Sequence, residues 1–97
     1  MSGNPSNDKL MAMSENGQAA MLSKATGYTC VGEKPYYMGT EKRPPNTNVS
    51  LWSITCSNNG KKFMIAIAPD PTGKTMVLQC NLLHGHPWEC YQKIKQR

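Results

Sequence analysis

The stretch CNLLHGHPWEC, residues 80–90, gathers four side chains of the types that bind metal ions. They are Cys80, His84, His86 and Cys90, in the pattern C-x3-H-x-H-x3-C. Thiolate and imidazole are ligands for zinc and copper, but structural zinc sites commonly combine a closely spaced cysteine pair with a histidine pair on a helix. We therefore expect a disulfide between Cys80 and Cys90, with both histidines in solvent. A zinc or copper site made by the four side chains is the alternative.

The elements that position this stretch begin with a helix. Residues 1–7 are polar and turn-rich and predict a flexible N-terminus, whereas residues 8–97 predict one small domain. Residues 6–8 are favourable N-caps, and a helical pattern runs from there to about Lys24, with Gly27 as its stop. The predicted apolar stripe of this helix consists of Leu10, Met13, Gly17, Met21 and Ala25.

Strand signals follow the helix. Residues 28–42 form a candidate first strand, interrupted near Gly32 and Pro35. Alternating apolar residues and the turn signals Asn-Gly and PDPTGK then predict an antiparallel meander. Its three strands are residues 50–56, 62–68 and 75–80. The expected fold class is α+β, with an N-terminal helix packed on one face of a three- to four-stranded antiparallel meander sheet and stapled by disulfides.

The meander limits how the four cysteines can pair. Cys56 and Cys80 would lie at the same end of the sheet but two strands apart, which is about 10 Å. A disulfide needs Cα atoms within about 7 Å. Cys30–Cys56 with Cys80–Cys90 is therefore the simplest pairing. Cys30–Cys80 with Cys56–Cys90 stays open if the strand order is not sequential.

The composition indicates a domain with a small hydrophobic core. Leu, Ile, Val and Phe account for 14 of the 97 residues, and a chain this short buries only about two thirds of its unfolded surface. Such domains often depend on disulfides, which persist in oxidising compartments. We expect a periplasmic or extracellular protein whose export signal is absent from the given chain, with a cytoplasmic location as the alternative. No apolar run is long enough for a membrane span.

One segment has the composition of a protein–protein interface. Residues 33–45 are rich in tyrosine and proline and also include methionine and arginine. Tyrosine, methionine and arginine are residue types that are enriched at interfaces. The alternative is that Tyr36 and Tyr37 alternate along a strand, one inward and one outward, as ordinary core and surface residues. If the domain binds a protein partner, we expect this segment to take part, and an edge strand could also pair with a second copy to form a homodimer. The predicted partner-binding residues are Tyr36, Tyr37, Met38, Lys42 and Arg43.

Charge and composition rank the remaining functions. The net charge of +5 could attract nucleic acid, but only two of the eleven basic residues are arginine, the type best suited to phosphate. A basic nucleic-acid-binding module is therefore the third hypothesis. The six acidic residues are scattered, so we predict no catalytic residues, no enzyme and no cofactor. The sequence favours a small exported, non-catalytic binding, inhibitory or accessory domain with two disulfides.

Overall fold

The computed structural model describes residues 1–95. Two α-helices, α1 (Pro5–Met11) and α2 (Glu15–Ala25), precede four strands and a short 3-10 helix, η1 (Cys80–Leu83). The strands are β1 (Gly32–Thr40), β2 (Ser50–Cys56), β3 (Lys62–Ile67) and β4 (Met76–Gln79). They form one antiparallel sheet in the order β1-β2-β3-β4, which confirms the predicted α+β fold and its meander. No helix among these residues is long and apolar enough to cross a membrane.

The predicted single helix is two helices. The Asn4 side chain accepts a hydrogen bond from the Asn7 backbone N–H and starts α1, and the Ser14 hydroxyl accepts one from Gly17 N–H and starts α2. Ser14 therefore interrupts the predicted helix, because its side chain satisfies N–H groups at a new helix start. The break changes which residues face the sheet, since Met13 and Met21, both in the predicted stripe, are 37% and 47% exposed.

Two asparagines anchor the N-terminal segment. The Asn4 side chain is fully buried and donates to the carbonyl oxygens of Asn48 and Ile67, at 2.9 and 2.8 Å. The Asn7 side chain, also fully buried, accepts a hydrogen bond of 2.7 Å from the Trp52 indole N–H. Residues 1–7 thus contribute two buried polar groups to the fold, while the flexibility predicted for them stays a prediction.

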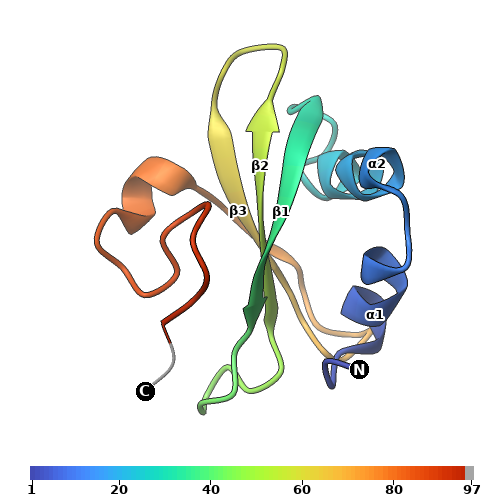
Figure 1. Ribbon diagram of the computed structural model, residues 1–97, viewed down its shortest axis with the longest axis vertical. Coiled ribbons are helices and arrows are strands. Elements are labelled where there is room, and N and C mark those ends of the chain that lie inside the picture. The colour runs from blue at the N-terminus through green and yellow to red at the C-terminus, as the bar shows by residue number, and fades with distance from the viewer. Residues whose placement is uncertain (96–97) are drawn as a thin grey trace.

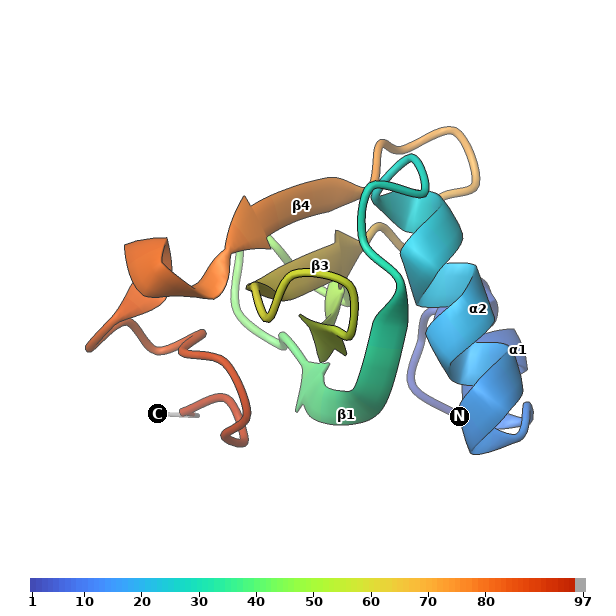
Figure 2. The ribbon, with the colours of Figure 1, turned by 90° about the horizontal axis from the view of Figure 1, so that it is seen from above.

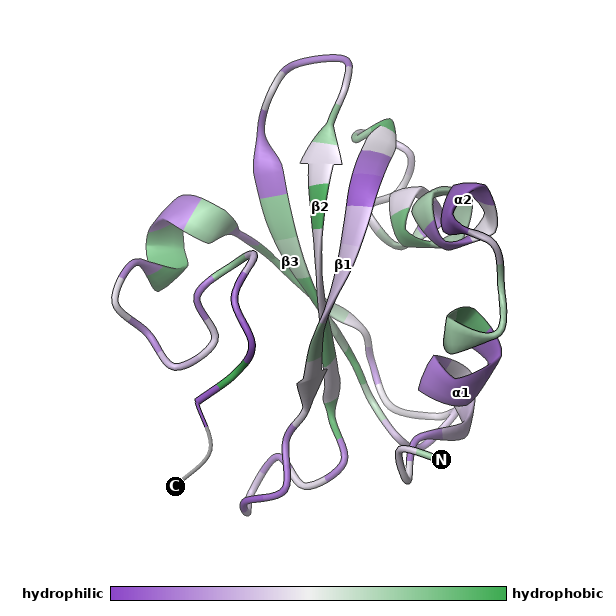
Figure 3. Ribbon diagram, viewed as in Figure 1, coloured by the Kyte–Doolittle hydropathy of each residue, from purple (hydrophilic) through white to green (hydrophobic). Residues whose placement is uncertain are grey.

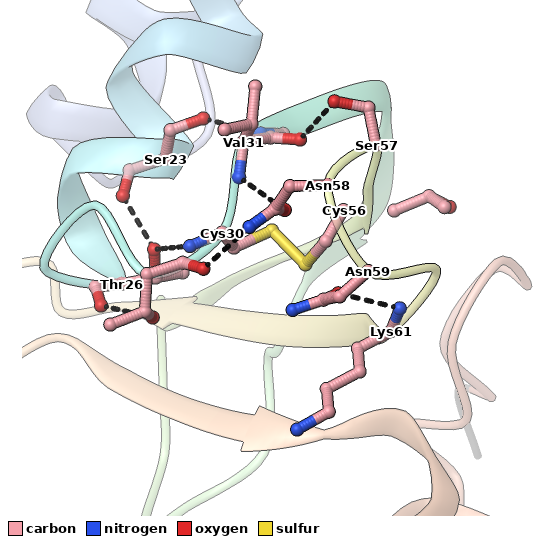
Figure 4. The surroundings of a disulfide bond; sticks show 12 residues. Ser23, Thr26, Cys30, Val31, Cys56, Ser57, Asn58, Asn59 and Lys61 are labelled. Atoms are coloured by element: carbon pink, nitrogen blue, oxygen red, sulfur yellow. Dashed lines mark hydrogen bonds between the residues drawn. A yellow bond between two sulfur atoms is a disulfide. The ribbon is translucent and has the colours of Figure 1, made fainter.

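The two disulfides join Cys30 to Cys56 and Cys80 to Cys90, which confirms the simplest pairing. The first is buried and joins the loop between α2 and β1 to the last residue of β2 (Figure 4). Asn58 reinforces this junction, because its side chain accepts from Val31 N–H and donates to the Thr29 carbonyl. The sequential strand order is the reason that Cys56 and Cys80 are not bonded to each other.

Both faces of the sheet are covered. α1 and α2 lie on one face, and residues 80–95 lie on the other (Figures 1 and 2). The fold therefore has three layers where two were predicted, and β2 is buried along almost its whole length. Hydrophobic stretches of β2 and β3 lie between these layers, while the turns at the sheet ends are mainly hydrophilic (Figure 3). The core under the helices contains Leu10, Leu22, Cys30, Trp52, Ile54, Cys56 and Ile65. The core under residues 80–95 contains Met38, Leu51, Met64, Ala66, Leu83 and Ile94.

The C-terminal segment also occupies the outer edge of β1. Ile94 N–H donates to the Met38 carbonyl at 3.0 Å, and the Lys93 ammonium donates to the Tyr37 carbonyl at 2.8 Å. β1 shifts its register twice against β2, once between Glu33 and Tyr36 and once between Tyr37 and Gly39. Register shifts and covered carbonyls are features that protect an edge strand from pairing with another chain.

Candidate functional site

A surface cleft lies between two loops that are far apart in the sequence. Residues 43–46, from the connection between β1 and β2, form one wall, and residues 86–88, from the loop closed by the Cys80–Cys90 disulfide, form the other. Glu41 and Lys95 complete the lining, and the cleft has a volume of about 230 Å³. Three prolines stand in the two walls. Because proline fixes its own φ angle, the backbone of both walls is restricted at these positions.

Glu41 holds the two walls together. Its carboxylate accepts one hydrogen bond from the Trp88 indole N–H at 3.0 Å and another from the Arg43 backbone N–H at 3.1 Å. The Trp88 hydrogen bond is the main reason that the pKa of Glu41 lies below its usual value. Glu41 is 8% exposed, so its oxygen atoms are directed to the protein. The Glu41 carboxylate therefore links the two walls through hydrogen bonds.

The histidine loop orients the tryptophan. The Trp88 backbone N–H donates to Nδ1 of His86 at 2.9 Å, and the two rings meet edge to face, with centroids 5.8 Å apart. Since Nδ1 accepts this bond, the neutral imidazole carries its proton on Nε2. Nε2 is then the donor atom of this exposed side chain, which lines the cleft.

The residues of the opening sequence motif do not form a metal site. The sulfur atoms of Cys80 and Cys90 are bonded to each other. The His84 side chain is 92% exposed and lies 3.7 Å from Glu89, whereas His86 packs against Trp88. Within residues 1–95 no three His, Cys, Asp or Glu side chains come together as metal ligands. The alternative of a site made by Cys80, His84, His86 and Cys90 is therefore wrong.

The five predicted partner-binding residues occupy different environments. Arg43 alone among them lines the cleft. The Lys42 ammonium donates to the Ser2 carbonyl at 3.1 Å. Tyr36 and Tyr37 are partly buried, and the Lys93 ammonium lies 5.2 and 5.3 Å from their ring centroids. Met38 is 0% exposed and belongs to the core under the C-terminal segment, so it cannot contact a partner directly.

Sequence reasoning missed Glu41, His86, Trp88 and Lys95 as members of one cleft. A tryptophan between a proline and a glutamate, inside a short loop between two cysteines, was the available signal. Nothing in the sequence indicates that this loop meets residues 41–46, because the contact depends on residues 80–95 crossing the sheet.

Comparison with family models, curated proteins and solved structures found no match for this chain. The chemistry of the cleft is therefore the basis for a functional proposal.

Proposed function

We propose that this protein is a small exported, non-catalytic domain that binds a protein partner, and that the cleft between residues 43–46 and 86–88 receives an acidic, extended segment of that partner. The observation that carries the proposal is the lining itself, which combines rigid proline walls, a tryptophan and two cationic side chains, Arg43 and Lys95. Aromatic residues and arginine are the types that most often dominate binding energy at interfaces.

The charges in the cleft favour an acidic partner. Glu41 is the one carboxylate that lines the cleft within residues 1–95, and both of its oxygen atoms accept hydrogen bonds from the protein. The side-chain donors of Arg43, Lys95 and His86 have no such partner among the hydrogen bonds of the described residues. Arginine can bind a carboxylate through two parallel hydrogen bonds, so an Asp or Glu side chain next to a proline or aromatic residue fits both the charge and the walls.

The same lining supports binding over catalysis. It offers one imidazole but no hydroxyl or thiol group among the described residues, so His86 has no neighbouring nucleophile to activate. Nucleic-acid binding is the competing function, since the chain carries a net charge of +5. A cleft with one arginine and a partly buried tryptophan provides little for stacked bases or repeated phosphates.

Two intramolecular disulfides in a small domain support the exported location, since such bonds persist in oxidising compartments. We propose a periplasmic or extracellular site of action. To test this location, the protein is produced once in an oxidising compartment and once in a reducing cytosol, and each product is denatured and treated with an alkylating agent. Unmodified cysteines are expected only from the oxidising one, and stable, folded protein with four alkylated cysteines from a reducing cytosol contradicts it.

A random twelve-residue peptide library selected on the purified protein tests the binding function. We expect enrichment of peptides in which Asp or Glu adjoins proline or an aromatic residue. The double variant Arg43→Gln, Lys95→Gln should bind the selected peptides at least about tenfold more weakly, because it removes two charge-assisted contacts. The matched control, Lys9→Gln with Lys61→Gln, makes the same charge change on exposed residues outside the cleft and should bind as the wild type does.

Three results contradict the proposal. One is selection of peptides without acidic residues, and another is equal weakening by the control pair, which would show a response to net charge alone. The third is steeply salt-dependent binding of an oligonucleotide that exceeds the binding of any selected peptide, which would favour the nucleic-acid hypothesis.

A further inference from the structure

We propose that the Cys80–Cys90 disulfide is a site of thiol–disulfide exchange with a dithiol reductant, and that its reduction opens the cleft wall formed by residues 86–88 and weakens partner binding. The effect on the partner rests on the function proposed above, whereas the exchange and the opening of the wall do not. Figure 1 shows residues 80–95, in orange and red, on the face of the sheet opposite the helices, so the reaction leaves the core under the helices intact.

The exchange needs only the bridge and the reductant. A thiolate of the reductant attacks one sulfur atom, the bond between Cys80 and Cys90 breaks, and a mixed disulfide forms. The released cysteine thiolate takes up a proton, and the second thiol of the reductant, as its thiolate, then attacks the mixed disulfide. The protein gains two electrons and two protons and carries two thiols, while the dithiol is oxidised to a disulfide.

The bridge can be reached from solvent. Cys80 and Cys90 are both partly exposed, and both line one hollow of the surface. Cys30 and Cys56, in contrast, are 1% and 0% exposed and lie in the core under the helices. Exchange requires that the attacking thiolate reaches a sulfur atom. A reductant should therefore react with Cys80–Cys90 while the other bridge stays closed.

The bridge closes the loop that carries one wall of the cleft. Residues 86–88 lie between the two cysteines. Within residues 1–95, the hydrogen bonds of residues 85–89 are made to nearby residues of the C-terminal segment, except for the bond from the Trp88 indole to Glu41. Partial packing of Trp88 on the core below is the other attachment. The wall therefore depends on the bridge to keep the two ends of the loop together.

Tyr91, the residue directly after Cys90, supplies the reason that the wall moves. Its φ is 60°, in the left-handed region, which a bulky side chain rarely adopts and which persists only when the surrounding structure enforces it. Its hydroxyl group is fixed, because it donates to the Lys34 carbonyl at 2.9 Å and lies 2.7 Å from the Thr55 hydroxyl. When the bridge opens, φ can relax, and rotation about it with the side chain held in place moves Cys90 and the wall that precedes it.

The reduced protein keeps its fold but loses the fixed geometry of this wall. Leu83 and Ile94, which flank the loop, are buried and stay packed on the sheet. The Trp88 indole and the His86 imidazole, by contrast, must be ordered again whenever a partner binds. Ordering side chains at an interface weakens binding, so we expect a loss of affinity of about tenfold for the selected peptides.

Titration of the full chain with dithiothreitol tests the site, and the indole N–H signals of Trp52 and Trp88 in NMR spectra report on the wall. Alkylation and mass spectrometry should find Cys80 and Cys90 modified first. The Trp88 signal should shift at the same reductant concentration, because the hydrogen bond of this indole across the cleft is lost. The Trp52 signal should stay, since that indole lies in the core under the helices.

The double variant Cys80→Ser, Cys90→Ser is the matched control. It should show the shifted Trp88 signal without reductant and bind the selected peptides about tenfold more weakly than the oxidised wild type does. It should not respond to dithiothreitol at concentrations that leave Cys30–Cys56 intact. Far-UV circular dichroism checks that the variant is folded, and the wild type should regain its original Trp88 signal on reoxidation.

A Trp88 signal that stays unchanged when Cys80 and Cys90 are reduced overturns the proposal, as does reduction of both bridges at one reductant concentration. Equal peptide affinity of the oxidised and the reduced protein overturns the effect on the partner. If no acidic peptide binds the oxidised protein, the function proposed above fails, and the alkylation and Trp88 measurements still decide the exchange and the opening of the wall.

Discussion

Removal of the Cys80–Cys90 disulfide by the double substitution Cys80→Ala, Cys90→Ala should lower the free energy of unfolding by about 2.7 kcal/mol. The bridge spans a sequence separation of 10 residues, and the loop-closure entropy of the unfolded chain gives this value for a loop of about that length. The Cys30–Cys56 bridge spans 26 residues, for which the same relation gives about 3.5 kcal/mol. The shorter bridge should therefore cost less to remove.

Packing increases the difference between the two bridges. Cys30 and Cys56 are 1% and 0% exposed, so their replacement by alanine also leaves a cavity in the core under the helices. Cys80 and Cys90 are partly exposed. The segment they close keeps other anchors, because Leu83 and Ile94 are buried and Ile94 N–H bonds to the sheet edge. We expect the variant lacking Cys80–Cys90 to remain folded.

Urea unfolding of the wild type and both double variants, followed by far-UV circular dichroism, measures these differences. The denaturant midpoint should fall in both variants, and further for Cys30→Ala, Cys56→Ala. In the wild type, mild reductant followed by alkylation and mass spectrometry should modify Cys80 and Cys90 first. Wild-type stability without Cys80–Cys90, or earlier reduction of the buried pair, would refute the reasoning.

Three further predictions concern single residues. Asn4→Ala should cost about 3 kcal/mol in urea unfolding, because it removes a helix cap and leaves two partly buried carbonyl oxygens without this donor. The lowered pKa of Glu41 means that its carboxylate stabilises the fold above its ordinary pKa and that this stability is lost as the pH falls through the lowered value. Trp88→Phe should therefore reduce the loss of stability on acidification, and an unchanged pH profile in acid unfolding would contradict this. Gly39→Ala should lower the thermal midpoint, because Gly39 has φ of 128° and an added methyl group would lie 3.1 Å from the Ile94 side chain; an unchanged midpoint would contradict this.

Local signals in the sequence predicted the sheet and the disulfides. Alternation along residues 50–56 and 62–67, with Asn59-Gly60 between them, fixes a hairpin through short-range chemistry alone. The sequential strand order then sets the distance between Cys56 and Cys80, so strand spacing excludes a bond between these two cysteines. These features could be read from the chain because each depends on residues close in sequence or on the regular geometry of a sheet.

The tertiary structure decided how the second face of the sheet is covered. Residues 80–95 carry no helical or strand periodicity, so nothing local indicates that Leu83 and Ile94 are buried against Met38 and Leu51. The helix break at Ser14 is of the same kind, because a capping side chain competes with helix continuation only where the fold favours two segments.

The cleft is also a feature that the tertiary structure decided. The Trp88 indole reaches Glu41 across 47 positions of sequence, and this contact depends on the packing of the C-terminal segment on the sheet. The sequence by itself thus predicted the antiparallel meander and favoured the observed disulfide pairing, through local periodicity and turn chemistry, while the pairing Cys30–Cys80 with Cys56–Cys90 stayed open until the strand order was known. The tertiary structure alone determined the site, because long-range burial of Leu83 and Ile94 brings its two walls together.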